Sequence, residues 1–207
     1  MKQLRIFVIP GYQAAPGDHW FPWMERTFGQ GDSTVEVLHL PTPQEPMPGP
    51  WVETIEAAVH RPDESTVLVC HSLGCIAALR YLDTLAGSWS LHGLILVAGF
   101  EERVPELPLL DPFTALPVDA PALARHITHR TVFASDNDPV VPSGLTRALA
   151  ERLSASLVEV HDAGHFLGSD GYGEFPELGT RLAGILEENP RQENRGSDGA
   201  LPARVMP

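Results

Sequence analysis

Short runs of apolar residues alternate along the chain with longer stretches whose apolar residues recur about every 3.6 positions. Several of the short runs, such as IFVI, VLVC and LILV, are apolar at every position. Strands that are apolar on both faces are typical of parallel sheets covered by helices on two sides. The pattern predicts strands at residues 4–9, 35–40, 66–70, 93–98, 131–135 and 157–161.

The stretches between these runs predict amphipathic helices. Pro50 and Pro142 fit the first turn of two of them, where a missing backbone N–H costs nothing. A strand–helix–strand alternation of this kind predicts an α/β fold with a doubly wound, mostly parallel sheet of about six strands. The predicted helices span about residues 18–28, 50–59, 73–86, 142–153 and 175–187.

Two segments depart from this alternation. Residues 100–129 carry prolines at 105, 108, 112, 117 and 121 and show no long periodic helix. A connection of this length within a compact domain is usually functional or disordered, and we expect a small proline-rich cap beside the site. Residues 188–207 are polar and aperiodic, which predicts a disordered C-terminal tail after a single domain at residues 1–187.

Charge and composition narrow the classes of partner. The 207 residues carry a formal net charge of −13, which argues against nucleic acid or an anionic membrane as a partner. No apolar run approaches a membrane span, and the run after the basic N-terminus is too short for a secretion signal. We expect a cytoplasmic protein, monomeric or a small homo-oligomer. Cys70 and Cys75 flank one turn, a poor geometry for a disulfide, and lack the partners of a zinc site.

The strongest chemical signal is the segment Cys70-His71-Ser72-Leu73-Gly74. It follows the apolar strand TVLVC and opens the helix LGCIAALRYL, which is the setting of a nucleophile elbow. Residues two before and two after the serine must be small in this tight turn, and both positions satisfy that demand. The helix N-terminus behind the serine would also stabilise an oxyanion. The sequence therefore predicts Ser72 as a catalytic nucleophile.

A serine hydroxyl is protonated at neutral pH, so it needs a neighbouring base. His165 follows the last predicted strand, and the chain order Ser, Asp, His is the one expected for this type of site. His71 adjoins the serine, so its side chain should point away from Ser72 into the structure. The remaining histidines fit structural or surface roles better, with one exception considered below: His39, His60, His92, His126, His129 and His161.

The orienting acid should follow the penultimate strand, where the loop holds both Asp136 and Asp138. Asp138 precedes a Pro-Val-Val-Pro run that fixes the backbone and starts the next helix, and it is the favoured candidate. Asp136 is the main alternative, and whichever is not the acid would bond its own turn. Asp162 lies too near His165 in sequence and is a minor alternative.

The first predicted loop should supply the remaining parts of the site. Backbone N–H groups of Tyr12 and Leu73 form the expected oxyanion hole, and Gly11 permits a close approach. His19 and Trp20 begin the next helix near the carboxyl edge of the sheet, where binding sites gather. We expect Gly11, His19 and Trp20 to contact substrate. The alternative is that Trp20 packs the helix onto the sheet.

These motifs resemble the small serine hydrolases typified by the YdeN and retinoblastoma-binding-protein-9 proteins, on the bacterial YdeN side. The resemblance implies a reduced α/β-hydrolase fold lacking the first strands of larger members, with Ser72, Asp138 and His165 as the triad, no metal and no organic cofactor. Cys70 stands where a glycine is usual, and family members accept small residues there. The matching stretches are HWFPW, LPTPQEP…W, HSLGC, LILVAGF, LLDPFT, DPVVP, GHFL and GYGEFPEL, and they fall within residues 4–187.

The sequence thus predicts a serine hydrolase that cleaves a small carboxylic ester or amide through an acyl-enzyme. A rival from another class is a degenerate hydrolase fold that acts as a protein-interaction module, although such proteins usually lose a residue of the triad. An acyltransferase or lipase would require a larger hydrophobic cap than this chain provides.

Overall fold

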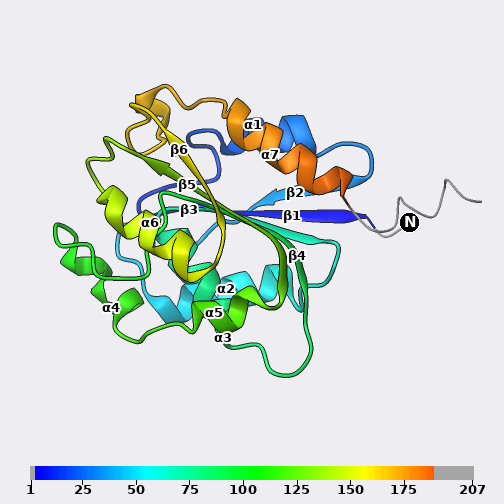
Figure 1. The fold of residues 1–207 in the computed structure, drawn as a ribbon, viewed down its shortest axis with the longest axis horizontal. Coiled ribbons are helices and arrows are strands. Elements are labelled where there is room, and N and C mark those ends of the chain that lie inside the picture. The colour runs from blue at the N-terminus through cyan, green and yellow to red at the C-terminus, as the bar shows by residue number, and fades with distance from the viewer. Residues whose placement is uncertain (1–2, 189–207) are drawn as a thin grey trace, which may run out of the picture.

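The computed structural model describes residues 3–188, and the chain forms one sheet of six strands (Figure 1). All neighbouring strands are parallel, in the order β2-β1-β3-β4-β5-β6. The α/β class, the number of strands and their direction are therefore as predicted. The strands are β1 (Leu4–Ile9), β2 (Ser33–Val37), β3 (Thr66–His71), β4 (Leu91–Val97), β5 (Ile127–Ser135) and β6 (Ser156–Val160).

Helices cover both faces of the sheet (Figure 1). One face carries α1 (Phe21–Phe28) and α7 (Pro176–Glu187), and the other carries α2 (Pro48–Val59), α3 (Leu73–Asp83) and α6 (Ser143–Arg152). The apolar residues of the sheet divide accordingly into two buried clusters, one beneath each layer of helices. Every residue of β3 and β4 is buried, which explains why both strands are predominantly apolar.

Several predicted boundaries differ from the structure: β5 begins at Ile127 and not at residue 131, α3 ends at Asp83 and not at residue 86, and two further differences have clear causes. The helix expected from residue 18 begins at Phe21, because His19 adopts a backbone φ of +53°, which is incompatible with a helix. The strand expected at residues 35–40 is β2, Ser33–Val37, because this segment pairs with β1 only that far. Leu40 is buried beyond the strand, so its apolar character reports burial rather than sheet pairing.

The proline-rich segment folds as short elements held to the domain by arginines. It contains a 3₁₀ turn at Pro108–Leu110 and two short helices, α4 (Asp111–Thr114) and α5 (Ala120–Ala124). Arg80 of α3 donates hydrogen bonds to the carbonyls of Phe113 and Leu116, and Arg152 of α6 donates to that of Val118. Figure 1 places α4 toward the end of the sheet at which the strands finish.

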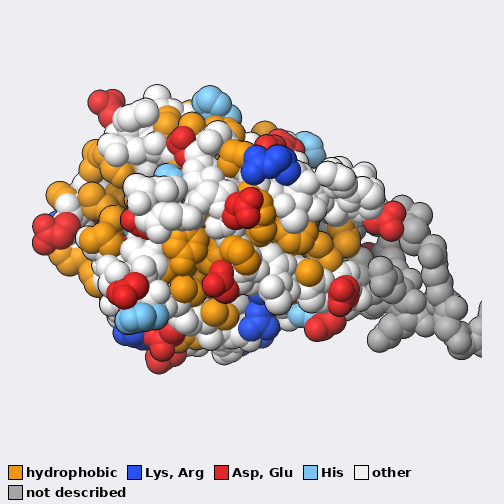
Figure 2. Space-filling model, turned by 90° about the horizontal axis from the view of Figure 1, so that it is seen from above, with side chains coloured by type: hydrophobic (Ala, Val, Ile, Leu, Met, Phe, Trp, Pro, Cys, Tyr) orange, Lys and Arg blue, Asp and Glu red, His pale blue; other side chains and the backbone are white. Residues whose placement is uncertain are grey.

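Acidic and apolar side chains are interspersed on the surface of the face that carries α1 and α7 (Figure 2). No helix within residues 3–188 is long and apolar enough to span a membrane. Cys70 and Cys75 are buried free thiols. Of the tail predicted at residues 188–207, all but Glu188 lies outside the described residues.

Candidate active site

Ser72 occupies a sharp turn between β3 and α3. Its backbone φ is +51° and its ψ is −120°, a conformation that costs free energy for any residue except glycine. The Ser72 N–H donates to the carbonyl of Val97 on β4, a 2.9 Å bond that fixes the turn against the sheet. This strained strand-to-helix turn is the geometry that a nucleophile elbow requires.

Two glycines allow the end of β1 to press against this turn. A Cβ atom at Gly74 would lie 2.4 Å from the carbonyl oxygen of Ile9 and 2.5 Å from that of Pro10. A Cβ atom at Gly11 would lie 2.9 Å from Ser72 Cβ. Real side chains do not tolerate such distances, so glycine is required at both positions. The loop after β1 therefore runs directly beside Ser72.

Ser72, His165 and Asp138 form a hydrogen-bonded chain. His165 Nε2 lies 2.9 Å from Ser72 Oγ, and His165 Nδ1 lies 2.7 Å from Asp138 Oδ2. Residue exposure is 5% for both Ser72 and His165, and the Asp138 side chain is 2% exposed. A carboxylate can only accept, so Nδ1 carries a proton toward Asp138 and Nε2 is left to accept the serine proton.

The backbone of its own loop orients Asp138. The N–H groups of Val140 and Val141 donate to Asp138 Oδ1 at 2.8 and 2.9 Å, which leaves Oδ2 for the histidine. The two alternative acids bond elsewhere. Asp136 contacts His161 and the backbone of Asp162, and Asp162 in turn accepts from a neighbouring asparagine.

Asp170 and His71 fix the backbone of His165 from within the domain. Asp170 Oδ2 accepts the His165 N–H at 2.9 Å and the Leu167 N–H at 3.0 Å. His71 Nε2 donates to the His165 carbonyl at 2.9 Å, which is a role that sequence reasoning did not identify. Burial lowers the pKa of His71 well below its usual value, and His165 nearby lowers it further. His71 is therefore a neutral, buried support for the base.

Of the three residues expected to contact substrate, Gly11 lies against Ser72, and Trp20 and His19 differ in their surroundings. Trp20 is fully buried in the core beneath α1 and α7, with its ring 4.7 Å from that of Phe21 and 5.9 Å from that of Phe175. The prediction that Trp20 lines the pocket was wrong, because its large apolar ring is used to pack α1 onto the sheet. His19 is half-buried and its Nδ1 accepts the Gly168 N–H at 3.0 Å, so it lies beside the loop that carries His165.

Two backbone N–H groups remain available near Ser72. Leu73 begins α3, and the first N–H groups of a helix have no acceptor within the helix. Within residues 3–188, the N–H groups of Tyr12 and Leu73 donate to no other residue. Their positions after β1 and directly after the serine match the two donors expected of an oxyanion hole.

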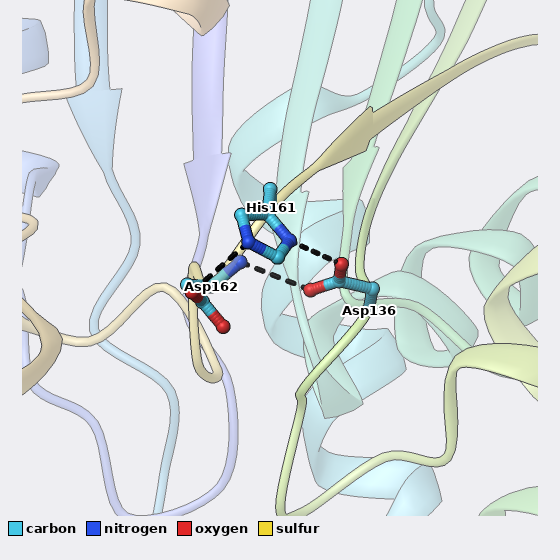
Figure 3. Close-up of side chains that lie close together, drawn as sticks. All are labelled: Asp136, His161 and Asp162. Atoms are coloured by element: carbon cyan, nitrogen blue, oxygen red, sulfur yellow. Dashed lines mark hydrogen bonds and ion pairs between the residues drawn. The ribbon is translucent and has the colours of Figure 1, made fainter.

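A group of possible metal ligands lies on the surface near these loops. One ligand atom from each of Asp136, His161 and Asp162 falls within 4.8 Å of the others (Figure 3). Both ring nitrogens of His161 already face carboxylates, at 2.6 Å for Asp136 and 3.1 Å for Asp162. That arrangement suits a protonated imidazole between two acids, since both ring nitrogens of a protonated histidine donate.

A cavity of about 540 Å³ lies between β5, β6 and α7. Its lining includes His129, Thr131, Phe133 and Arg181, and none of Ser72, Asp138 or His165. It is therefore separate from the hydrogen-bonded chain.

Comparison with known proteins supports the same class of chemistry. The serine hydrolase family profile matches residues 6–184. The hydrolase YdeN of Bacillus subtilis is 37% identical over 187 residues, covering 90% of this chain and 98% of that protein. The serine hydrolase RBBP9 of Rattus norvegicus is 28% identical over 162 residues, covering 77% of this chain and 82% of that protein.

A solved structure agrees with these relationships. The crystal structure of the B. subtilis ydeN gene product superimposes with a TM-score of 0.86 at 35% identity, covering 90% of this chain and all of that one. The sheet order, the strained serine turn and the extent of the profile match agree with these relatives. This chain belongs to the serine hydrolase family and has the α/β-hydrolase fold.

Proposed function

We propose that this protein hydrolyses small carboxylic esters or amides through an acyl-enzyme, with Ser72 as nucleophile, His165 as base and Asp138 as the orienting acid. The single observation that carries the proposal is the continuous chain of hydrogen bonds from Ser72 Oγ through the His165 ring to Asp138. A serine becomes nucleophilic only when a base can take its proton, and a third group must hold that base in the correct tautomer.

The reaction follows from this geometry. Ser72 Oγ attacks the substrate carbonyl carbon while its proton passes to His165 Nε2, and the tetrahedral oxyanion accepts hydrogen bonds from the Tyr12 and Leu73 N–H groups. The carbon–leaving-group bond then breaks as His165 returns the proton to the departing oxygen or nitrogen. Water repeats the sequence on the acyl-enzyme, which releases the acid and restores Ser72.

Asp138 stabilises the imidazolium that forms during each half-reaction. Its buried carboxylate stays in place because two backbone N–H groups hold its other oxygen. His19, whose burial lowers its pKa, is a neutral side chain beside the histidine loop and is our proposed contact for the substrate's leaving group or acyl chain. The two free, buried thiols suit a protein of the reducing cytoplasm.

The test is hydrolysis of p-nitrophenyl esters of increasing chain length beside aminoacyl p-nitroanilides, which separates ester from amide preference. Ser72→Ala is expected to lose about 10⁴-fold or more in kcat with an unchanged circular dichroism spectrum. A variant that kept more than about a tenth of the activity would exclude Ser72 as nucleophile. Wild-type protein inactive on both substrate classes would favour the interaction-module alternative.

A further inference from the structure

Three consecutive residues of the β5–α6 loop each bond to the loop that carries His165. Asp138 reaches His165 itself, as described above. Asp136 accepts the Asp162 N–H at 2.9 Å and the ring of His161 at 2.6 Å (Figure 3). Asn137 lies between these two acids and bonds to the same loop twice.

The amide of Asn137 uses both of its ends. Its Oδ1 accepts the Gly164 N–H at 2.8 Å, and its Nδ2 donates to Asp162 Oδ1 at 3.2 Å. The hydroxyl of Ser135, at the end of β5, lies 2.8 Å from the same Oδ1. Because Gly164 N–H can only donate, this contact fixes which end of the amide is oxygen.

Gly164 directly precedes His165, so the Asn137 bond acts one peptide away from the base. Gly164 adopts a φ of +57°, and a Cβ atom there would lie 2.6 Å from the Asp170 carboxylate. The next two backbone groups, the N–H and carbonyl of His165, are bonded to Asp170 and His71. Those supports belong to the histidine loop and the core. The Asn137 bond ties the Gly164 backbone, directly before the base, to the loop of Asp138.

We propose that Asn137 is a positioning residue that sets the spacing between the acid loop and the histidine loop, so that Asp138 stays bonded to His165 while the ring gains and loses its proton. The exposed contact between Asp136 and His161 holds the same two loops together. The inference rests on the catalytic roles proposed for Asp138 and His165.

A purely structural role for Asn137 would have a different signature. Its side chain is exposed, so truncation removes no buried apolar surface and should change the stability of the fold little. A loss of alignment between acid and base, in contrast, lowers kcat while substrate binding stays the same. Residues that orient metal ligands through hydrogen bonds typically contribute about 10- to 100-fold to activity, and we expect a loss of the same order here.

The experiment compares Asn137→Ala with Ser169→Ala, a control in the exposed 3₁₀ turn of the same loop. We expect Asn137→Ala to lower kcat for a p-nitrophenyl ester about 10- to 100-fold with little change in KM or melting temperature. The rate at which a fluorophosphonate labels Ser72 should fall in parallel, because labelling uses the same base. Ser169→Ala should match the wild type in all four measurements.

Two further variants test the hydrogen bond between Asn137 and Asp162 by exchanging its amide and carboxylate. Asn137→Asp keeps an acceptor for Gly164 but sets a carboxylate against that of Asp162, so it should be as impaired as Asn137→Ala. The double variant N137D/D162N exchanges donor and acceptor, so it should recover most of the lost kcat. Failure of the double variant to exceed N137D would contradict the proposal.

Proton NMR separates this inference from the proposed reaction. The His165 Nδ1 proton shared with Asp138 should give a low-field line in wild-type protein that broadens or shifts upfield in Asn137→Ala. If the wild type shows the line but no hydrolysis, the proposed function fails and the positioning inference stands on the loss of the line in the variant. An Asn137→Ala variant with wild-type kcat and an unchanged line, or one whose stability falls as much as its activity, overturns the inference.

Discussion

The turn that carries Ser72 and the two loops that carry Asp138 and His165 are held by different forces. Backbone atoms fix the serine turn, because Gly11 and Gly74 let the end of β1 approach without any intervening side chain. Polar side chains fix the other two loops, through bonds made by Asn137 and Asp170 among others.

This difference predicts how each region fails. A turn held by close backbone approach has no room for an added methyl group, and its disruption should affect the whole sheet edge. Loops held by polar side chains lie partly in solvent, so a lost bond there should disturb alignment more than stability. We therefore expect added side-chain volume to destabilise the serine turn, and the loss of hydrogen-bonding side chains to misalign the two loops.

The largest effect is expected from Asp138→Asn. The amide presents a donor or a weaker acceptor to His165 and favours the wrong imidazole tautomer, which should lower kcat about 10⁴-fold. The neighbouring Asp136→Asn is the control and should lower kcat only about 10-fold. Steady-state kinetics on one p-nitrophenyl ester measures both variants. The reverse ranking would move the acid assignment to Asp136.

A smaller effect, on stability, is expected from Gly74→Ala. The new Cβ would collide with the backbone carbonyls of Ile9 and Pro10, so the free energy of unfolding should fall by about 3 kcal/mol. Gly17→Ala is the matched control, since no atom lies within 4 Å of a Cβ there. Urea denaturation followed by circular dichroism gives both values. Equal stability of the two variants would contradict the account of the serine turn.

The smallest expected effects concern the pH dependence of the free energy of unfolding. His71, beside the serine turn, and His161, in the loop of His165, should change it in opposite directions. Burial holds the pKa of His71 below its unfolded value of 6.5, so the unfolded chain binds more protons as the pH falls and His71 makes the fold less stable below about pH 6.5. Asp136 raises the pKa of His161 above 6.5, so the stabilisation from that pair is complete below pH 6.5 and is lost as the pH rises through the raised pKa.

Urea denaturation between pH 5 and pH 8 tests both signs. The stability lost in His161→Gln relative to wild type should be greater at pH 5 than at pH 8. His71→Gln should show a shallower decline in stability toward pH 5 than the wild type. A His161→Gln difference that grows toward alkaline pH would mean that the imidazole is not held between carboxylates in the folded protein.

Much of the fold could be predicted because the determining signals are local. The strand Leu4–Ile9 matches its predicted bounds, and the start of α3 at Leu73 follows from the strand–turn–helix pattern around Ser72. The parallel arrangement follows from strands that are apolar on both faces. The bounds of β2 could not be predicted from the apolar pattern, because burial outside a sheet produces the same apolar residues as burial within it.

The supporting contacts could not be predicted, because they join residues far apart in the chain. His71 bonds to His165, and Asn137 bonds to Gly164, across 94 and 27 positions respectively. Nothing in the local sequence distinguishes such an asparagine from an ordinary turn residue. Trp20 shows the opposite error, since its position near the carboxyl edge suggested a binding role while its burial serves the core.

The most direct test of the central claim is covalent labelling with a fluorophosphonate, located by mass spectrometry of the digested protein. The account predicts one modified peptide, with the probe on Ser72, and no labelling of Ser72→Ala. His165→Ala should be labelled far more slowly than the wild type while remaining folded. Labelling at another residue, or wild-type protein that does not react, would contradict the assignment of Ser72 as an activated nucleophile.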